Sequence, residues 1–269
     1  MLEVLGYLLA TLVGISLGLI GGGGSILMVP ILVYVMGINP ILATSYSLFI
    51  VGFTSLVGAF NNYKKGLVNI QVALLFGISS ITTVFITRKI VLPKVPKVLF
   101  NIGHFQVTQA LATMVLFALL MLFASFAMIN DKQADVDTGE VSKPSNLTIV
   151  KVVGFGLLIG LATGFLGAGG GFLLIPALVL ILKMPMKNAI GTSLLIIALN
   201  SLIGFIGDLG HFIIDWKFLL VITLIAIAGV FAGGFLSKKI AGEKLKKGFG
   251  WFVLIMGICI IFKELFFTT

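Results

Sequence analysis

Apolar runs separated by short polar or basic segments fill most of the chain. Runs at 41–61, 67–87, 189–207, 214–236 and 247–267 have the length that a helix needs to cross a membrane. A helix rises about 1.5 Å per residue, so about twenty residues span a hydrocarbon core of about 30 Å. The pattern therefore predicts an all-α, polytopic membrane helix bundle. A further segment at 98–129 is polar at its start and apolar afterwards.

Two runs, 4–36 and 148–183, are too long for one ordinary span, and each is interrupted by a cluster of glycines. The clusters read GLIGGGGSILMVP from Gly18 and GFLGAGGGFLLIP from Gly164. Each glycine costs a helix interior about 1 kcal/mol relative to alanine, so such a cluster predicts a broken helix. The freed backbone amides need a protein partner or a polar cavity within lipid, and their partial positive charge suits an anion.

An offset of 146 residues aligns the first half of the chain with the second without a gap, from Gly14 over Gly160 to about Gln71 over Lys217. Identical residues then align in the glycine clusters and in the following span, as in the pairs Gly18/Gly164, Gly24/Gly170, Pro30/Pro176, Ser47/Ser193 and Gly58/Gly204. The chain therefore divides into a membrane repeat at 1–129, an acidic extramembrane linker at 130–147 and a second membrane repeat at 148–269. Paired, glycine-interrupted apolar segments are typical of a transporter with its site near the bilayer midplane.

Two basic segments, 88–97 and 238–247, occupy equivalent places in the two repeats. If both obey the positive-inside rule, they lie on one face of the membrane. We therefore expect about eight net crossings, in which each broken segment crosses once, the repeats are parallel and both termini lie outside. The alternative is ten helices in inverted repeats, with each broken segment forming a complete hairpin.

Composition supports a membrane protein and argues against several other classes. Hydrophobic residues make up 59% of the chain, charged residues 10%, and the mean hydropathy is +1.22. The net charge of +9 comes from lysines in short loops, where they act as topology signals, so we expect no nucleic-acid partner. We find no cluster with metal-ligand spacing and no nucleophile with an evident base, and therefore expect no enzyme, metal or cofactor.

Polar groups near the two breaks are the candidate substrate-binding residues. Backbone amides of the glycine clusters would hold the anion, and hydroxyl groups at the head of the following spans would support them. Asn101 and His104 share one face if 98–129 is a helix, and an imidazole inside a bundle is a functional candidate. The full set is Gly22, Gly23, Gly24, Ser25, Thr44, Ser45, Asn101, His104, Gly169, Gly170, Gly171, Thr192 and Ser193.

Each of these candidates has a structural alternative. The glycines could serve close helix packing, and the hydroxyl groups could bond the carbonyls of their own helices. His104 could lie at the solvated interface just past Lys97.

The paired glycine motifs, together with ATSYS after Pro40 and IGTS after Asn188, resemble the TauE/SafE family of sulfite and organosulfonate exporters. The resemblance covers essentially the whole chain. It implies a multi-pass permease of the bacterial inner membrane that exports a small sulfur-containing anion such as sulfite or sulfoacetate. Alternating access is the expected mechanism, with an anion channel or a non-transporting membrane scaffold as alternatives. The expected partners are the anion and the lipid bilayer, and the sequence leaves a homodimer open.

Overall fold

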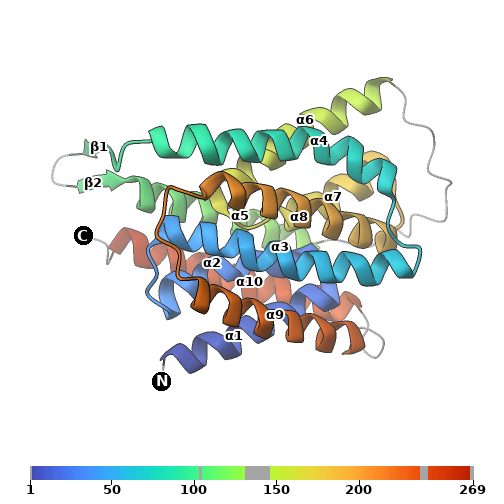
Figure 1. Ribbon diagram of the computed structural model, residues 1–269, viewed down its shortest axis with the longest axis horizontal. Helices are drawn as coiled ribbons and strands as arrows, with labels where there is room; N and C mark the ends of the chain where they lie inside the picture. Colours follow the sequence, from blue (N-terminus) through green and yellow to red (C-terminus); the bar gives the residue numbers. More distant parts are fainter. Residues whose placement is uncertain (1, 103–104, 131–145, 237–241, 267–269) are drawn as a thin grey trace.

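The computed structural model describes residues 2–102, 105–130, 146–236 and 242–266. Most of them are helical (Figure 1). The helices are α1 (Leu2–Ile20), η1 (Gly22–Leu27), α2 (Met28–Pro30), η2 (Ile31–Val35), α3 (Pro40–Lys64), α4 (Ile70–Ile86), η3 (Thr87–Val91), η4 (Leu92–Lys94), α5 (Gln109–Asn130), α6 (Asn146–Leu166), α7 (Gly171–Leu182), α8 (Met186–Asp208), α9 (Trp216–Leu236) and α10 (Gly242–Phe266). The strands are β1 (Val98–Ile102) and β2 (Phe105–Thr108).

The first broken segment is a hairpin. Gly21 ends α1 with a φ of 79°, a conformation that glycine adopts without steric cost. The chain then passes through η1, α2 and η2 and returns along α1, so that the side chain of Met36 packs on Gly6. The segment therefore ends at the same end of the molecule at which it began.

The second broken segment has the same form. Gly167, Gly169 and Gly170 all have positive φ angles between α6 and α7. The chain reverses there, and α7 runs back toward the end at which α6 started (Figure 1). The glycine clusters thus break both helices, as the sequence predicts, and each break turns the chain around.

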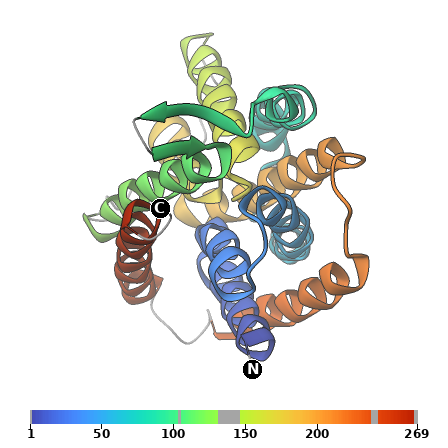
Figure 2. The same ribbon diagram turned by 90° about the vertical axis from the view of Figure 1, so that its left-hand side faces the viewer.

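This reversal corresponds to the geometry of the ten-helix alternative and differs from a single net crossing per broken segment. The basic segment 88–97 lies at the end of the bundle that holds the start of α1 and the end of α10 (Figures 1 and 2). The start of α10 lies at the opposite end. The described part of the second basic segment, 242–247, therefore does not share one end of the bundle with 88–97, contrary to the expectation from the positive-inside rule.

Helices of one half pack on helices of the other half, and the contacts come in pairs related by the 146-residue offset. A Cβ atom on Gly14 of α1 would lie 2.9 Å from the carbonyl carbon of Ala226 in α9, the residue that corresponds to Ser80. A Cβ atom on Gly160 of α6 would likewise lie 3.1 Å from the Cα atom of Ser80 in α4. Small residues at these crossings let the backbones approach closely.

The central pair, α3 and α8, runs antiparallel through the core. A Cβ atom on Gly58 would lie 3.2 Å from Leu194, and one on Gly204 would lie 3.2 Å from Leu48. These two contacts are again related by the offset. Four helices among the described residues are long and apolar enough to cross a membrane, namely 40–64, 70–94, 186–208 and 216–236.

The segment 98–129 departs from the all-α prediction. Residues 98–102 and 105–108 form two antiparallel strands in which Asn101 of β1 pairs with Gln106 of β2, and α5 starts only at Gln109. The start of the segment is rich in β-branched and aromatic residues, which favour strands. The prediction of one helical face that carries Asn101 and His104 is therefore wrong.

Candidate functional site

The two glycine breaks lie at the centre of the bundle, each against the middle helix of the other half. A Cβ atom on Gly21 would lie 2.6 Å from the Cγ2 atom of Ile190 in α8. One on Gly167 would lie 2.6 Å from the Cα atom of Thr44 in α3. Ile190 and Thr44 are equivalent under the 146-residue offset, so each break is held by the corresponding helix of the other half.

The breaks also touch each other, and this contact is tight. Gly22 and Gly171 approach so closely that neither leaves room for a Cβ atom. Gly24, Gly169 and Gly170 are buried as well. Gly21 and Gly170 stand at the N-cap positions, where glycine has no side chain to accept from the first amides of the helix that follows.

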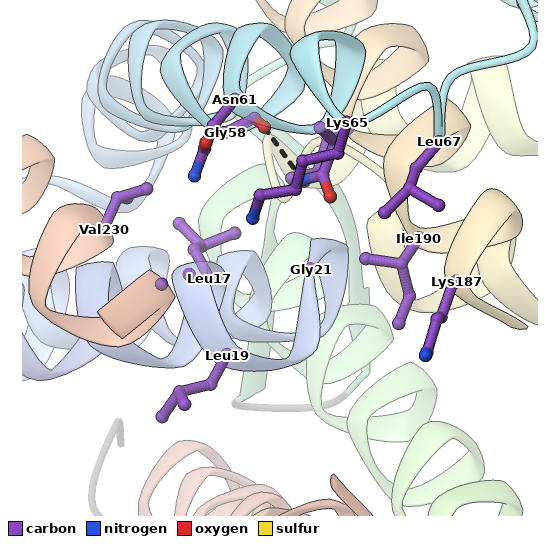
Figure 3. Close-up of a pocket in the computed structure, with 14 residues that line it drawn as sticks. Leu17, Leu19, Gly21, Gly58, Asn61, Lys65, Leu67, Lys187, Ile190 and Val230 are labelled. Atoms are coloured by element: carbon purple, nitrogen blue, oxygen red, sulfur yellow. Dashed lines mark hydrogen bonds between the residues drawn. The ribbon is translucent and has the colours of Figure 1, made fainter. Parts of the chain in front are cut away.

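A cavity of about 320 Å³ opens beside the first break (Figure 3). Its walls come from α1, α3, α8 and α9, and its apolar members include Leu17, Ile190 and Leu194. Its polar members are Asn61, Asn62, Lys65 and Lys187. Gly21, which ends α1 at the first break, is also one of the lining residues.

The charge of this cavity is positive. Lys65 extends from the end of α3 over Leu17 and Gly21, and Lys187 enters from the start of α8 (Figure 3). Both lysines are exposed, so the cavity reaches the surface at this end. The residues that line it include no Asp or Glu. Apolar walls around two cations favour a small anion.

Most of the predicted hydroxyl ligands have partners within the protein. Ser25 Oγ donates to the carbonyl oxygen of Gly22 at 2.8 Å, and Ser193 Oγ donates to that of Ile190 at 2.9 Å. Thr192 Oγ1 accepts from the backbone N–H of Asn69 at 3.0 Å. Ser25 and Ser193 therefore bond nearby carbonyls, as their structural alternative expects, whereas Thr192 joins the start of α8 to the start of α4.

Thr44 and Ser45 lie near the opposite end of the bundle from the cavity. Thr44 Oγ1 donates to the carbonyl oxygen of Ile41 and accepts from Arg88 Nη1 at 3.0 Å, and Ser45 is fully buried. Gly23 lies in η1. His104 and most of the acidic linker lie outside the described residues. Within the described part of the chain, no group of three or more His, Cys, Asp or Glu side chains could hold a metal ion.

Sequence reasoning missed the charged groups closest to the breaks. The sequence pattern indicates only loop cations at Lys65 and Lys187, because their distance from Gly21 depends on how α3 and α8 cross. It indicates the same for Arg88, although this residue is the only arginine in the chain. An arginine among seventeen lysines is the signal that could have singled it out.

Paired broken helices that meet inside an apolar helix bundle, beside a cavity with two lysines on its walls, are typical of a multi-pass membrane transporter. The chain belongs to the TauE/SafE family of membrane transporters, because the family model described as "Sulfite exporter TauE/SafE" matches residues 6–260.

Several relatives carry the name probable membrane transporter protein. One from Xylella fastidiosa (strain 9a5c) is 32% identical over 256 residues, which cover 94% of this chain and 92% of the relative. YunE of Bacillus subtilis (strain 168) is 27% identical over 286 residues, 98% of each chain. YdhB of the same strain is 25% identical over 251 residues, 93% of this chain and 97% of the relative. No solved structure matches the chain significantly.

Proposed function

We propose that this protein exports a small sulfur-containing oxyanion, such as sulfite or sulfoacetate, by alternating access. The observation that carries the proposal is the cavity beside Gly21, which has Lys65 and Lys187 on its walls and no carboxylate among its lining residues. The description of the family as sulfite exporters supports the choice of anion. Gly21 on the cavity wall precedes the predicted backbone site at Gly22–Ser25, and Gly22 contacts Gly171 of the predicted site at Gly169–Gly171.

We further propose ten membrane-inserted passes arranged as two inverted repeats. Both broken segments return to the end at which they start, which gives five passes in each half. Inverted repeats of this kind, with discontinuous helices at their interface, support alternating access in other transporters.

The end at which the cavity opens would then face the cytoplasm. In the described segments this end carries more lysines than the other, as the positive-inside rule expects of a cytoplasmic face. They are Lys64, Lys65, Lys151, Lys183, Lys187, Lys244, Lys246 and Lys247, against Lys89, Lys94, Lys97, Lys217 and Lys263 at the opposite end. The structure would therefore be open to the inside, where an exported anion must enter.

Export in this direction needs no coupling ion. The membrane potential is negative inside, and it favours the exit of an anion by about 2.3 kcal/mol per charge per 100 mV. A uniport mechanism is therefore sufficient for outward movement, whereas uptake against the potential would require coupling.

Counterflow in proteoliposomes tests the proposal. Vesicles loaded with unlabelled sulfite or sulfoacetate should accumulate the same labelled anion, and the initial rate should saturate with its concentration. Sulfate and chloride serve as comparison anions, and protein-free vesicles serve as the control. A conductance without saturation or counterflow would establish the channel alternative. The absence of any anion-dependent flux would favour the alternative of a non-transporting membrane scaffold.

A further inference from the structure

The end of the bundle opposite the cavity holds its counterpart under the 146-residue offset. The offset relates the contacts of the two halves in pairs, Gly21–Ile190 to Gly167–Thr44 and Gly58–Leu194 to Gly204–Leu48, as described above. The offset can therefore also be applied to the residues that line the cavity. Their counterparts belong mainly to α3, α4, α6 and α8 and lie near the other end of the bundle.

One difference between the two sets of residues explains why the counterpart of the cavity is filled by a side chain. Gly234, which lines the open cavity, corresponds to Arg88. Asn62 and Ile190, two other lining residues, correspond to Asp208 and Thr44. Arg88 contacts both of these counterparts, because its Nη1 atom lies 3.0 Å from Asp208 Oδ2 and 3.0 Å from Thr44 Oγ1. The guanidinium therefore occupies the place that stays open on the other side, where glycine has no side chain.

The Arg88 guanidinium is buried but only partly paired. Its side chain is 0% exposed, and that of Asp208 is 2% exposed. Arg88 Nε and Nη2 are buried and have no hydrogen-bond partner among the described residues. A buried donor without an acceptor is costly, and such groups in a native structure call for an explanation.

The two unpaired donors lie on the same edge of the guanidinium. Nε–H and one N–H of Nη2 point in parallel, and this edge binds two oxygens of one carboxylate, sulfonate or phosphate group at once. Nη1, on the other edge, holds Asp208 and Thr44. A ligand oxyanion can therefore approach Arg88 on an edge that the protein leaves free.

We propose that Arg88 is an anion-binding residue of the transport pathway, and that Asp208 occupies it while this end of the pathway is closed. The proposal rests on the proposed export function and specifies its substrate as an oxyanion with two equivalent oxygens. When the second cavity opens, the transported oxyanion binds the Nε–Nη2 edge of Arg88. The negative charge of Asp208 competes with the anion and promotes its release.

Variants at the two positions separate this role from that of a structural ion pair. Arg88→Gln should lose the thermal stabilisation of the purified protein by sulfoacetate and raise the half-saturation concentration of counterflow at least tenfold. Asp208→Asn should retain counterflow, with an equal or lower half-saturation concentration, because the competing charge is gone. The double variant should behave like Arg88→Gln. Lys89→Gln, which removes an exposed cation from the same turn, is the matched control and should resemble the native protein.

Opposite results would overturn the proposal. A structural pair predicts that both single variants fail and that the double variant recovers counterflow, since it leaves no unpaired charge. A half-saturation concentration in Arg88→Gln equal to that of the native protein would also overturn the proposal. If Arg88→Gln does not fold, Arg88→Lys keeps the charge but removes the two-donor edge, and native affinity in that variant would also refute the role. Absence of counterflow in the native protein would instead refute the export function itself.

Discussion

A Cβ atom built on Gly22 would lie 2.7 Å from the Cα atom of Gly171, so the two glycine breaks meet backbone to backbone. Neither residue has a positive φ, and the need for glycine here is therefore steric rather than conformational. The contact joins the first break of one half to the start of α7 in the other half. A movement of either break relative to the other would therefore change a contact between backbones.

We expect Gly171→Ala to destabilise the protein, because the atoms that its methyl group meets belong to the backbone of Gly22 and cannot rotate away. Overpacking of this kind costs about 1–3 kcal/mol. The apparent Tm in detergent should fall, together with the yield of monodisperse protein. Gly154→Ala in α6 is the matched control, since nothing lies within 4 Å of its added Cβ atom and alanine favours a helix. An unchanged Tm in Gly171→Ala would contradict the tight contact.

Topology can be tested with two single cysteines in a Cys259→Ser background. Tyr63 ends α3 and Ile213 lies between α8 and α9, and both side chains are exposed. Ten passes in inverted repeats place them on opposite sides of the membrane, whereas eight crossings in parallel repeats place both outside. A membrane-impermeant thiol reagent added to intact cells should therefore label Ile213→Cys and leave Tyr63→Cys unlabelled until the cells are opened. Labelling of both in intact cells would favour the eight-crossing arrangement.

Removal of the two cavity cations should weaken anion capture. We expect Lys65→Gln combined with Lys187→Gln to raise the half-saturation concentration for sulfite about two- to thirtyfold, since each exposed charge contributes about 0.2–1 kcal/mol. The rise should shrink as ionic strength increases. Lys64→Gln is the control, because Lys64 is exposed and packs over the ring of Phe60 outside the cavity. An equal effect of the control would indicate a general surface potential instead of a site.

We expect Thr192 to contribute to the stability of the fold and not to the binding of the anion. Its Oγ1 atom accepts the backbone N–H of Asn69 at the start of α4, so Thr192→Val leaves a partly buried donor without its partner. The expected loss is about 1–3 kcal/mol in the free energy of unfolding, seen as a lower Tm. The half-saturation concentration of the folded fraction should not change. If Thr192→Val instead raises the half-saturation concentration and keeps the native Tm, Thr192 is a ligand of the anion.

The sequence by itself determined most of the helices and the places where two of them break. Glycine clusters end α1 and α6 because glycine destabilises a helix wherever it stands, and Asn39 with Pro40 starts α3 because a side-chain cap acts within one turn. The family could also be predicted, since its motifs are local runs of residues. These features depend on neighbours along the chain.

Only the tertiary structure decided the direction of the chain after each break and the partners of its charges. A glycine allows a turn but does not set its angle, which is fixed here by the packing of Met36 on Gly6. The pairing of Arg88 with Asp208 joins residues 120 positions apart. Lys65 and Lys187 likewise approach Gly21 only because α3 and α8 cross at the core. Such contacts arise from the packing of helices against each other, and no local pattern of residues encodes them.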